Sequence, residues 1–367
     1  MRLRTGLLAL VPLLAACDGG GGSSTFDLPR LEWTWVEVEG AVCADGSPTG
    51  LAVNPGPEGS TDVLVFLMGG GACWDWVTCN AAVTASRGPY GATQFDEERR
   101  RRLEGSVLDR TVEGSPFGGA TLVFIPYCTG DVHWGDAERD YGWEHRGARN
   151  LGLDAAWITT HLPAPGKLVV SGSSAGGFGS LLAHDLLRSS WPDAKGYLVD
   201  DSGPPFVGGD VILALRAAWF LSWGLDGTLD RLCEDDACFG DLSQAVVELA
   251  EKYPDDRIAL LSTREDLVIR SFFGFLPADE FEESLLELVD TRIEPLEHGA
   301  AFLVPGDGHA LLEQFAAWSA DETPLPDWIN QMVNDDPGWN TLGRAEPPAL
   351  RDAAGSPGAW AERAPQP

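Results

Sequence analysis

Six short apolar runs recur along the chain, and each of them ends in loop residues. Their hydrophobic positions do not alternate strictly with polar ones, which predicts strands that are buried on both faces, as in a parallel sheet. The runs cover residues 62–68, 120–127, 167–172, 196–202, 257–263 and 300–306.

Longer segments with helical periodicity lie between several of these runs, at residues 95–108, 146–161, 175–187 and 243–252. Strands that alternate with helices predict an α/β fold, with a mostly parallel sheet flanked by helices. In such sheets the reactive residues lie in loops at the carboxyl ends of the strands, so those ends are where candidate chemistry is sought.

Residues 206–238 fit this alternation less well. Trp219, Phe220 and Trp223 have helical spacing, which is typical of a helix that packs on a core; the alternative is a lid or pocket wall. We therefore expect one domain over residues 32–335, with 206–250 as a candidate helical lid or insertion. The Pro-, Ala- and Gly-rich residues 336–367 are predicted to form an irregular tail.

The N-terminus reads MRLRTGLLALVPLLAAC, with two arginines ahead of an apolar run that is too short to span a bilayer. Its end, Leu14-Ala15-Ala16-Cys17, resembles the lipobox of bacterial lipoproteins, in which the cysteine is acylated. We therefore predict a lipoprotein signal peptide over residues 1–17 and lipidation of Cys17, followed by a flexible tether over residues 18–31. The protein would be exported and held by its lipid anchor on the periplasmic or extracellular side of a membrane. The alternative is an ordinary secretory signal with an incidental cysteine.

The net charge and the number of cysteines indicate which partners the protein can bind and which cellular compartment suits it. The 56 acidic and 25 basic residues give a net charge of −31, which disfavours nucleic acid as a partner. The acidity is dispersed, as on an ordinary hydrated surface, and a monomer is expected. Without Cys17, six cysteines remain, an even number that favours disulfides in an exported protein. Sequence spacing favours short loops between Cys73 and Cys79 and between Cys233 and Cys238, which leaves Cys43 with Cys128.

The stretch VVSGSSAGGFGS contains a G-x-S-x-G match centred on Ser174. A predicted strand precedes it and a predicted helix follows it, which is the context of a nucleophile elbow in which a sharp turn exposes a serine. The alternative is a purely structural glycine turn. Ser171 and Ser173 lie outside the apex, so Ser174 is the candidate nucleophile.

A serine nucleophile needs a base and an acid at other strand ends. Of six histidines, His309 is the last, and it follows the predicted strand 300–306. This position matches the Ser, acid, His chain order of α/β-hydrolases. Asp266, which follows the strand 257–263, is the candidate acid, with Glu265 as its neighbouring alternative.

A glycine loop follows the strand 62–68 and resembles the oxyanion loops of esterases. Backbone N–H groups in such a loop can stabilise the negative charge that develops on an ester carbonyl. The expected oxyanion residues are Gly70, Gly71, Ala72 and Ala175. A phosphate-binding loop is disfavoured, because no lysine follows in the P-loop position.

Four segments together resemble the pectin acetylesterase and Notum family of carboxylesterases: VCADGSPTG, LMGGGACWDWVTCN, IPYCTGDVHWGD and SGSSAGG. The resemblance covers most of residues 40–310. It implies an α/β-hydrolase-like fold, hydrolysis of an O-acyl ester without a cofactor or metal, and a Cys43–Cys128 bridge. It supports Ser174, Asp266 and His309 as a triad.

The chain also departs from the family pattern. Met68 stands for the usual glutamate, Ala72 for an aromatic residue, and Ser173 for a frequent cysteine. The change at Ala72 alters the pocket, so the substrate cannot be transferred from the family. A substrate pocket is expected around Trp74, Trp134, Ser202, Trp219 and Trp223.

The sequence predicts an esterase that acts on an acylated small molecule or glycan, with an O-acetyl ester of a polysaccharide as the expected substrate. The acyl chain length and the alcohol stay open, and a pectin, a bacterial glycan and a lipid-modified protein are the alternatives. Three other functions stay open. The chain could be a catalytically inactive hydrolase fold that binds polysaccharide, an amidase or peptidase that uses the same triad, or a metal-dependent hydrolase that uses His133 and Asp136.

Overall fold

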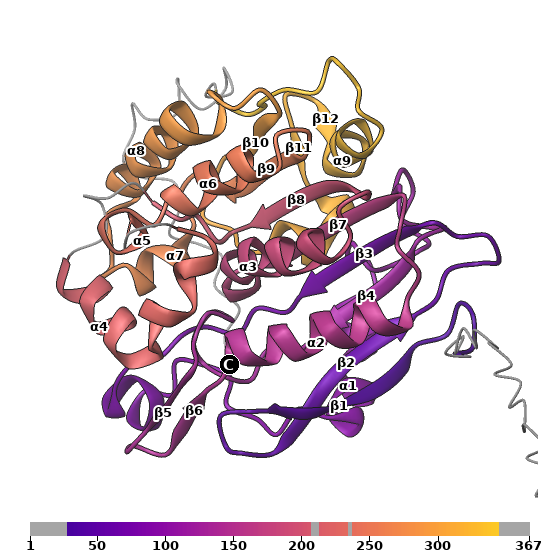
Figure 1. Ribbon diagram of the computed structural model, residues 1–367. Helices are drawn as coiled ribbons and strands as arrows, with labels where there is room; N and C mark the ends of the chain where they lie inside the picture. Colours follow the sequence, from indigo (N-terminus) through magenta and orange to yellow (C-terminus); the bar gives the residue numbers. More distant parts are fainter. Residues whose placement is uncertain (1–27, 207–212, 234–236, 345–367) are drawn as a thin grey trace, which may run out of the picture.

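One eight-stranded sheet organises the computed structural model, which describes residues 28–206, 213–233 and 237–344 (Figure 1). Its strand order is β1-β2-β4-β3-β7-β8-β9-β10, and the neighbours from β4 to β10 are parallel, while β1–β2 and β2–β4 are antiparallel. The strands are β1 (Thr34–Val42), β2 (Pro48–Asn54), β3 (Asp62–Leu67), β4 (Thr121–Ile125), β7 (Lys167–Ser173), β8 (Lys195–Asp201), β9 (Arg257–Thr263) and β10 (Gly299–Val304).

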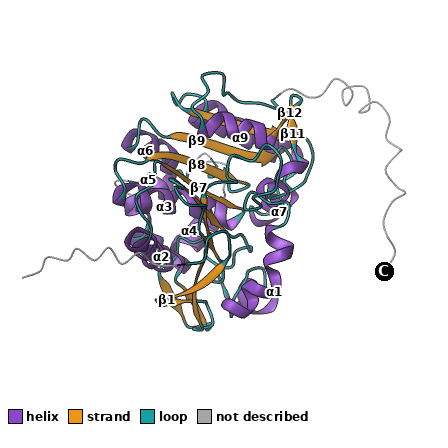
Figure 2. Ribbon diagram, turned by 90° about the vertical axis from the view of Figure 1, so that its right-hand side faces the viewer, coloured by secondary structure: helices purple, strands orange, loops and turns teal. Residues whose placement is uncertain are grey.

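Helices cover both faces of this sheet. Figure 2 shows α2, α3 and α6 on one side of the strands and α1 and α9 on the other. The helices are α1 (Ala92–Leu103), α2 (Gly147–His161), α3 (Ala175–Ser190), α4 (Leu213–Trp223), α5 (Ala237–Gly240), α6 (Gln244–Lys252), α7 (Leu267–Phe272), α8 (Ala278–Leu288) and α9 (Leu325–Val333). Shorter elements include η1 (Val77–Ala81), η5 (Leu311–Ala317) and the small hairpins β5 (Ala137–Arg139) with β6 (Trp143–His145) and β11 (Ser319–Ala320) with β12 (Thr323–Pro324).

The predicted α/β-hydrolase-like class is confirmed, because the six apolar runs form the parallel strands β3, β4 and β7 to β10. Their side chains are buried nearly throughout, as runs without alternation require. The helix predicted over residues 95–108 lies earlier in the structure, where α1 spans Ala92–Leu103. It begins after Gly91, whose N–H donates to the Gln94 side chain. It ends at Leu103, just before Gly105, whose φ of 75° is outside the helical region.

The two edge strands β1 and β2 extend the sheet beyond the predicted parallel part. Side chains of β1 are partly exposed, so this strand lacks the continuous apolar signal of the others. Helix α2 fixes the end of β1, because the Asn150 amide accepts a hydrogen bond from the Val42 N–H and donates one to its carbonyl.

The described residues contain three disulfides, with the pairings that the sequence predicts: Cys43–Cys128, Cys73–Cys79 and Cys233–Cys238. The first joins the end of β1 to the segment after β4. The second closes a short loop directly after the glycine loop that follows β3. Two of the three bridges therefore lie close to the carboxyl end of the sheet.

The described chain continues past β10 to residue 344. Leu342 N donates to Ala301 O and Leu303 N donates to Leu342 O, so part of the predicted tail runs along β10. The predicted signal peptide, Cys17 and most of the tether lie outside the described residues. Within the part that is described, none of the helices combines the length and apolarity needed to cross a bilayer.

Candidate active site

Ser174 lies at a sharp turn between β7 and α3, with φ 59° and ψ −121°. A positive φ is costly for a residue with a side chain, and here it is maintained by tight packing of the flanking backbone. A Cβ atom on Gly172 would lie 2.2 Å from the Gly176 carbonyl oxygen, and one on Gly176 would lie 2.1 Å from that of Leu67. The two glycines of G-x-S-x-G are therefore required by close approach of β3, β7 and α3.

His309 and Asp266 form a direct pair beside this turn. His309 Nδ1 lies 2.7 Å from Asp266 Oδ2, so Nδ1–H donates and Nε2 is the nitrogen directed away from the acid. The other carboxylate oxygen, Oδ1, accepts from the N–H groups of Val268 and Ile269 at the start of α7. Asp266 is fully buried, so its orientation is fixed by three hydrogen bonds.

The sheet order places the candidate residues at one edge. Ser174 follows β7, Asp201 ends β8, Asp266 follows β9 and His309 follows β10, and these four strands are consecutive neighbours. All four strands are parallel, so these residues lie at their carboxyl ends, as the topology of such sheets predicts.

Asp201 connects the nucleophile turn to the histidine loop. Its carbonyl accepts from Ser174 N at 2.7 Å, and its Oδ2 accepts from Ser173 Oγ at 2.6 Å. The same carboxylate accepts from Leu311 N and Leu312 N, both at 2.9 Å, just after His309. Asp201 is not among the site residues that the sequence predicts, because its connecting position follows from the pairing of β8 with β7.

The surrounding carboxylates determine the charge state of His309. Burial alone would lower the pKa of its imidazole, but the hydrogen bond and charge of Asp266, followed by the charges of Asp201 and Glu313, raise it above the ordinary value. The imidazolium is therefore stabilised, which favours a base that accepts a proton during reaction.

Asp200 and Asp201 are adjacent buried carboxyl groups. Burial raises the pKa of Asp201 to about 6, although hydrogen bonds from Ser173, Leu312 and Leu311 oppose the rise. Burial, together with the charge of Asp201, raises the pKa of Asp200 well above its ordinary range. Asp200 is thus protonated, and the two adjacent carboxyl groups do not both carry a negative charge.

The glycine loop after β3 lies against the nucleophile turn. Gly71, at φ 77°, is bridged to Ala85, and Ser86 N donates to Gly70 O, so the loop is held on its outer side. Gly71 and Ala72 line the same pocket as Ser174 and Ala175. Gly70, the fourth expected oxyanion residue, is not part of that lining; its Cα faces Ser86 and Tyr127.

His133 supports the glycine loop from beneath. Its Nε2 lies 3.0 Å from the Met68 carbonyl oxygen, which can only accept, so Nε2–H donates. Burial lowers the pKa of His133 to about 4, against the opposing effect of the Met68 carbonyl, so the ring is neutral at pH 7.

The metal-site alternative needs His133 and Asp136 to act together. His133 instead bonds Met68, and Asp136 pairs with Arg146 at 2.8 Å. Among the described residues, one group has the spacing of metal ligands, namely Cys73, Cys79 and His145, and its two cysteines form a disulfide. His133 and Asp136 thus have separate partners.

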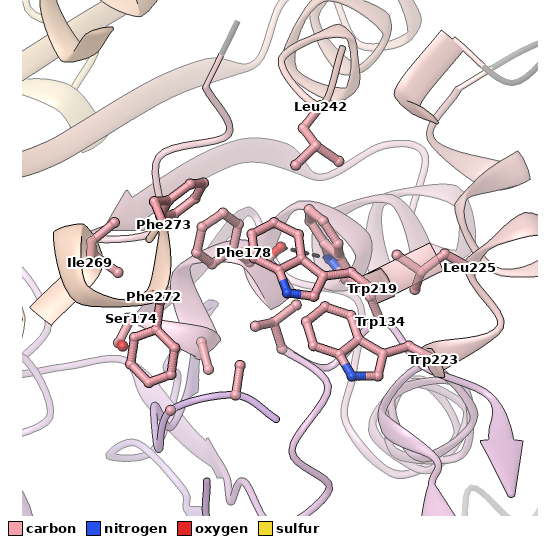
Figure 3. A pocket seen from close by; sticks show the side chains of 14 residues that line it. Trp134, Ser174, Phe178, Trp219, Trp223, Leu225, Leu242, Ile269, Phe272 and Phe273 are labelled. Carbon is pink, nitrogen blue, oxygen red and sulfur yellow. Dashed lines mark hydrogen bonds between the residues drawn. The ribbon is translucent and has the colours of Figure 1, made fainter. Parts of the chain in front are cut away.

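An apolar pocket of about 530 Å³, including its open mouth, begins at Ser174. Figure 3 shows Ser174 beside Phe272 at one end, with Trp219, Trp223 and Leu225 toward the other. Ser174 contributes the only hydroxyl to the described lining, which also contains Gly71, Ala72, Val132, Trp134, Ala175, Phe178, Leu242, Ile269 and Phe273. This pocket suits an apolar group attached close to the reacting atom.

Three of the five expected pocket residues line it, namely Trp134, Trp219 and Trp223. Trp74 does not; its ring packs edge-on against Trp219, 6.0 Å between centroids, and so supports the wall from behind. Ser202 is also absent from the lining, because its hydroxyl accepts from Ala310 N and donates to Asp201 Oδ1. Phe272 and Phe273 were missed, since nothing in the sequence places α7 beside the glycine loop.

Comparisons with known proteins show similarity to carboxylesterases. The model of the Pectinacetylesterase family matches residues 31–211. The palmitoleoyl-protein carboxylesterase NOTUM of Drosophila melanogaster is 29% identical over 46% of this chain and 26% of its own length. Pectin acetylesterase 5 of Arabidopsis thaliana is 28% identical over 57% of this chain and 51% of its own length. The inactive palmitoleoyl-protein carboxylesterase notum1b of Danio rerio is 31% identical over 29% of this chain and 76% of its own length.

The extent of these matches limits what they cover. The alignments span 26 to 34% of the length of the first four NOTUM relatives. The matched family region contains the glycine loop and Ser174 but ends before Asp266 and His309. The pairing of those two residues therefore rests on the geometry of this chain.

Proposed function

The chain belongs to the pectin acetylesterase and Notum family of carboxylesterases, and from that premise we propose that it hydrolyses a carboxylic ester through an acyl-enzyme on Ser174. The observation that carries the proposal is the strained turn at Ser174, which borders an apolar pocket. The Asp266–His309 pair lies at the same edge of the sheet as this turn.

In the first step, His309 Nε2 accepts the hydroxyl proton of Ser174 while Ser174 Oγ attacks the ester carbonyl carbon. Asp266 holds Nδ1–H at 2.7 Å, so the imidazole is oriented and its positive charge is stabilised. The tetrahedral intermediate then expels the alcohol, which takes the proton from Nε2. Water, deprotonated by His309, releases the carboxylic acid and restores Ser174.

The negative oxygen of the intermediate needs donors that are already in place. We assign this role to the backbone N–H groups of Gly71, Ala72 and Ala175, which border the pocket at Ser174. Ala175 is the first residue of α3, so the positive end of the helix dipole supports the same charge. His133 fixes the glycine loop through Met68.

The pocket favours an apolar acyl group larger than acetyl. Its apolar lining extends from Ser174 and Phe272 to Trp223 and Leu225, farther than an acetyl group reaches (Figure 3). Apart from the Ser174 hydroxyl and the indole N–H groups, the lining offers no polar side-chain group to sugar hydroxyls. We therefore assign the pocket to the acyl part of the ester, with the alcohol part outside it. A polysaccharide O-acetyl ester, the substrate expected from the sequence, fits this lining less well.

The export signal remains part of the proposal. Cleavage before Cys17 and acylation of its thiol would leave residues 18–31 as the tether of an esterase domain at residues 32–335. Mass spectrometry of the mature N-terminus tests this directly. An unmodified N-terminus at another residue would replace the lipoprotein assignment by a secreted one.

The test of catalysis compares Ser174→Ala with Ser171→Ala. Ser171 is a buried serine of the preceding strand β7, and its hydroxyl has no hydrogen-bond partner. A fluorophosphonate probe should label the parent and Ser171→Ala but not Ser174→Ala, and turnover of p-nitrophenyl esters should follow the same order. Turnover should rise from acetyl to octanoyl esters. Absence of labelling in the parent would favour the inactive binding protein, a relevant outcome because one relative is named inactive. Faster cleavage of the matching anilide would favour an amidase, and inhibition by chelators a metal-dependent hydrolase.

A further inference from the structure

Large apolar side chains are exposed almost exclusively around the pocket. Ten such side chains occur in the described part of the chain, and Leu31 alone belongs to a segment remote from the pocket walls. The other nine, which we call the apolar rim, are between 38% and 82% exposed: Trp76, Val77, Val83, Leu213, Leu221, Phe239, Leu267, Val268 and Phe275. Scattered apolar residues are normal on a protein surface, but this concentration is not.

The rim segments contact one another around the pocket. Helix α4 is joined to the loop after β3 by two hydrogen bonds, from Ser222 Oγ to Trp74 O and from Trp223 Nε1 to Cys73 O. The same face of α4 meets the C-terminal end of α7, since the Trp219 ring stacks on that of Trp223 and lies 5.5 Å, edge to face, from that of Phe273. Figure 1 shows α4, α5 and α7 grouped at the same end of the molecule.

The pocket and the rim thus share their elements. Phe272 of α7 approaches the glycine loop, because a Cβ atom on Gly71 would lie 3.3 Å from its ring. Phe239 of α5 packs on Phe220 of α4, with ring centroids 4.9 Å apart. The segments that carry the rim therefore also border the pocket.

Charge distinguishes these segments from the rest of the protein. Residues 76–83, 213–223 and 267–275 contain no aspartate or glutamate, although 56 acidic residues are spread over the 367-residue chain. Their charged residues are Arg216, which is buried and donates to Phe239 O, and Arg270. These three segments therefore contribute no carboxylate to a lipid headgroup layer, whereas in the sequence the rim residue Phe239 lies between Asp236 and Asp241 and Trp76 follows Asp75.

We propose that the apolar rim docks on an electrically neutral lipid surface that contains the ester substrate. The acyl chain then passes from the lipid into the pocket without being exposed to water. A net charge of −31 opposes approach to an anionic surface, so the occupant is a zwitterionic or uncharged lipid layer. This inference rests on the proposed function for its purpose, but docking itself requires no turnover.

The test uses the mature chain from residue 18 onward, which lacks both the predicted signal peptide and the predicted lipidated Cys17, with Ser174→Ala, which removes turnover. Sedimentation with phosphatidylcholine vesicles measures binding. A rim variant adds Trp76→Ser, Leu221→Ser and Phe275→Ser, and the matched control adds Leu31→Ser at the exposed apolar site remote from the pocket. We expect the parent and the Leu31→Ser control to bind alike, and the rim variant to lose about tenfold in partitioning for each side chain removed.

Thermal melting shows whether the rim variant remains folded, as expected for substitutions at exposed positions. Failure of the parent to bind neutral vesicles would overturn the inference, as would binding only to phosphatidylglycerol vesicles. An equal loss of binding in the Leu31→Ser control would also overturn it. So would a parent that is a dimer in solution while the rim variant is a monomer. The vesicle experiment uses the inactive Ser174→Ala variant, so its result does not depend on whether the chain is an esterase. A failure of docking can therefore be distinguished from a failure of the esterase assay.

Discussion

Replacing Ser173 by alanine tests the connection between the nucleophile turn and the histidine loop. The Ser173 hydroxyl donates to Asp201 at 2.6 Å, and both side chains are fully buried. Without it, the carboxylate keeps its bonds from Leu311 N, Leu312 N and Ser202 Oγ but loses its shortest one. The variant therefore removes one charge-assisted hydrogen bond and makes no large cavity.

A hydrogen bond to a charged group contributes about 1.5–3 kcal/mol, and a neutral one about 0.5–1.5 kcal/mol, to the free energy of unfolding. Burial raises the pKa of Asp201 to about 6, so its contribution to stability is fully present below the unfolded value and decreases as the pH rises through about 6. The Ser173 hydroxyl lowers that pKa and so offsets part of the decrease. The loss in Ser173→Ala should be near the upper range at pH 8 and near the lower range at pH 5.

Urea unfolding of Ser173→Ala and Ser171→Ala at the two pH values measures this difference. Ser171 is a matched control, since it lies two residues earlier on β7 and its buried hydroxyl has no partner. We expect little change in the midpoint for Ser171→Ala. Equal losses in the two variants, or a loss in Ser173→Ala that does not depend on pH, would refute the assigned role of the bond.

Three further outcomes follow from the site and its scaffold. Gly176→Ala should prevent correct folding or abolish turnover, because its new Cβ would lie 2.1 Å from a β3 carbonyl oxygen; circular dichroism and the ester assay check this. Esterase activity should fall with decreasing pH as His309 becomes protonated, which the acidic limb of the kcat/KM profile measures. Because Asp266 raises the His309 pKa, Asp266→Asn should move that limb to lower pH and lower the activity at every pH. Replacing Cys43 and Cys128 by alanine should cost about 2–5 kcal/mol in urea unfolding, because that bridge closes a loop of 85 residues.

The sequence predicts the scaffold of the site because its signals are local. Continuous apolar runs identify strands buried on both faces, and the strand ends then limit where a serine, an acid and a histidine can meet. Ser174, Asp266 and His309 were selected by this rule, and the structure brings their strands together. The six cysteines pair as spacing predicts because two of the loops are short.

The remaining features depend on contacts that are distant in sequence. The position of Asp201 beside Ser173 arises from the register of β8 on β7, which composition does not encode. Ser202 was assigned to the pocket, but its hydroxyl bonds Asp201 and Ala310 instead. The approach of Phe272 to the glycine loop likewise requires the placement of α7, a helix of only six residues.

The reacting groups and the pocket walls come from different parts of the fold. Ser174, Asp266 and His309 follow β7, β9 and β10, whereas α4 and α7, which lie outside the sheet, supply four side chains of the wall: Trp219, Trp223, Ile269 and Phe272. Mutational drift in the wall can therefore alter acyl selectivity while the reaction centre keeps its geometry. For protein engineering, α4 is the segment in which a combinatorial library would change substrate range at the least risk to turnover.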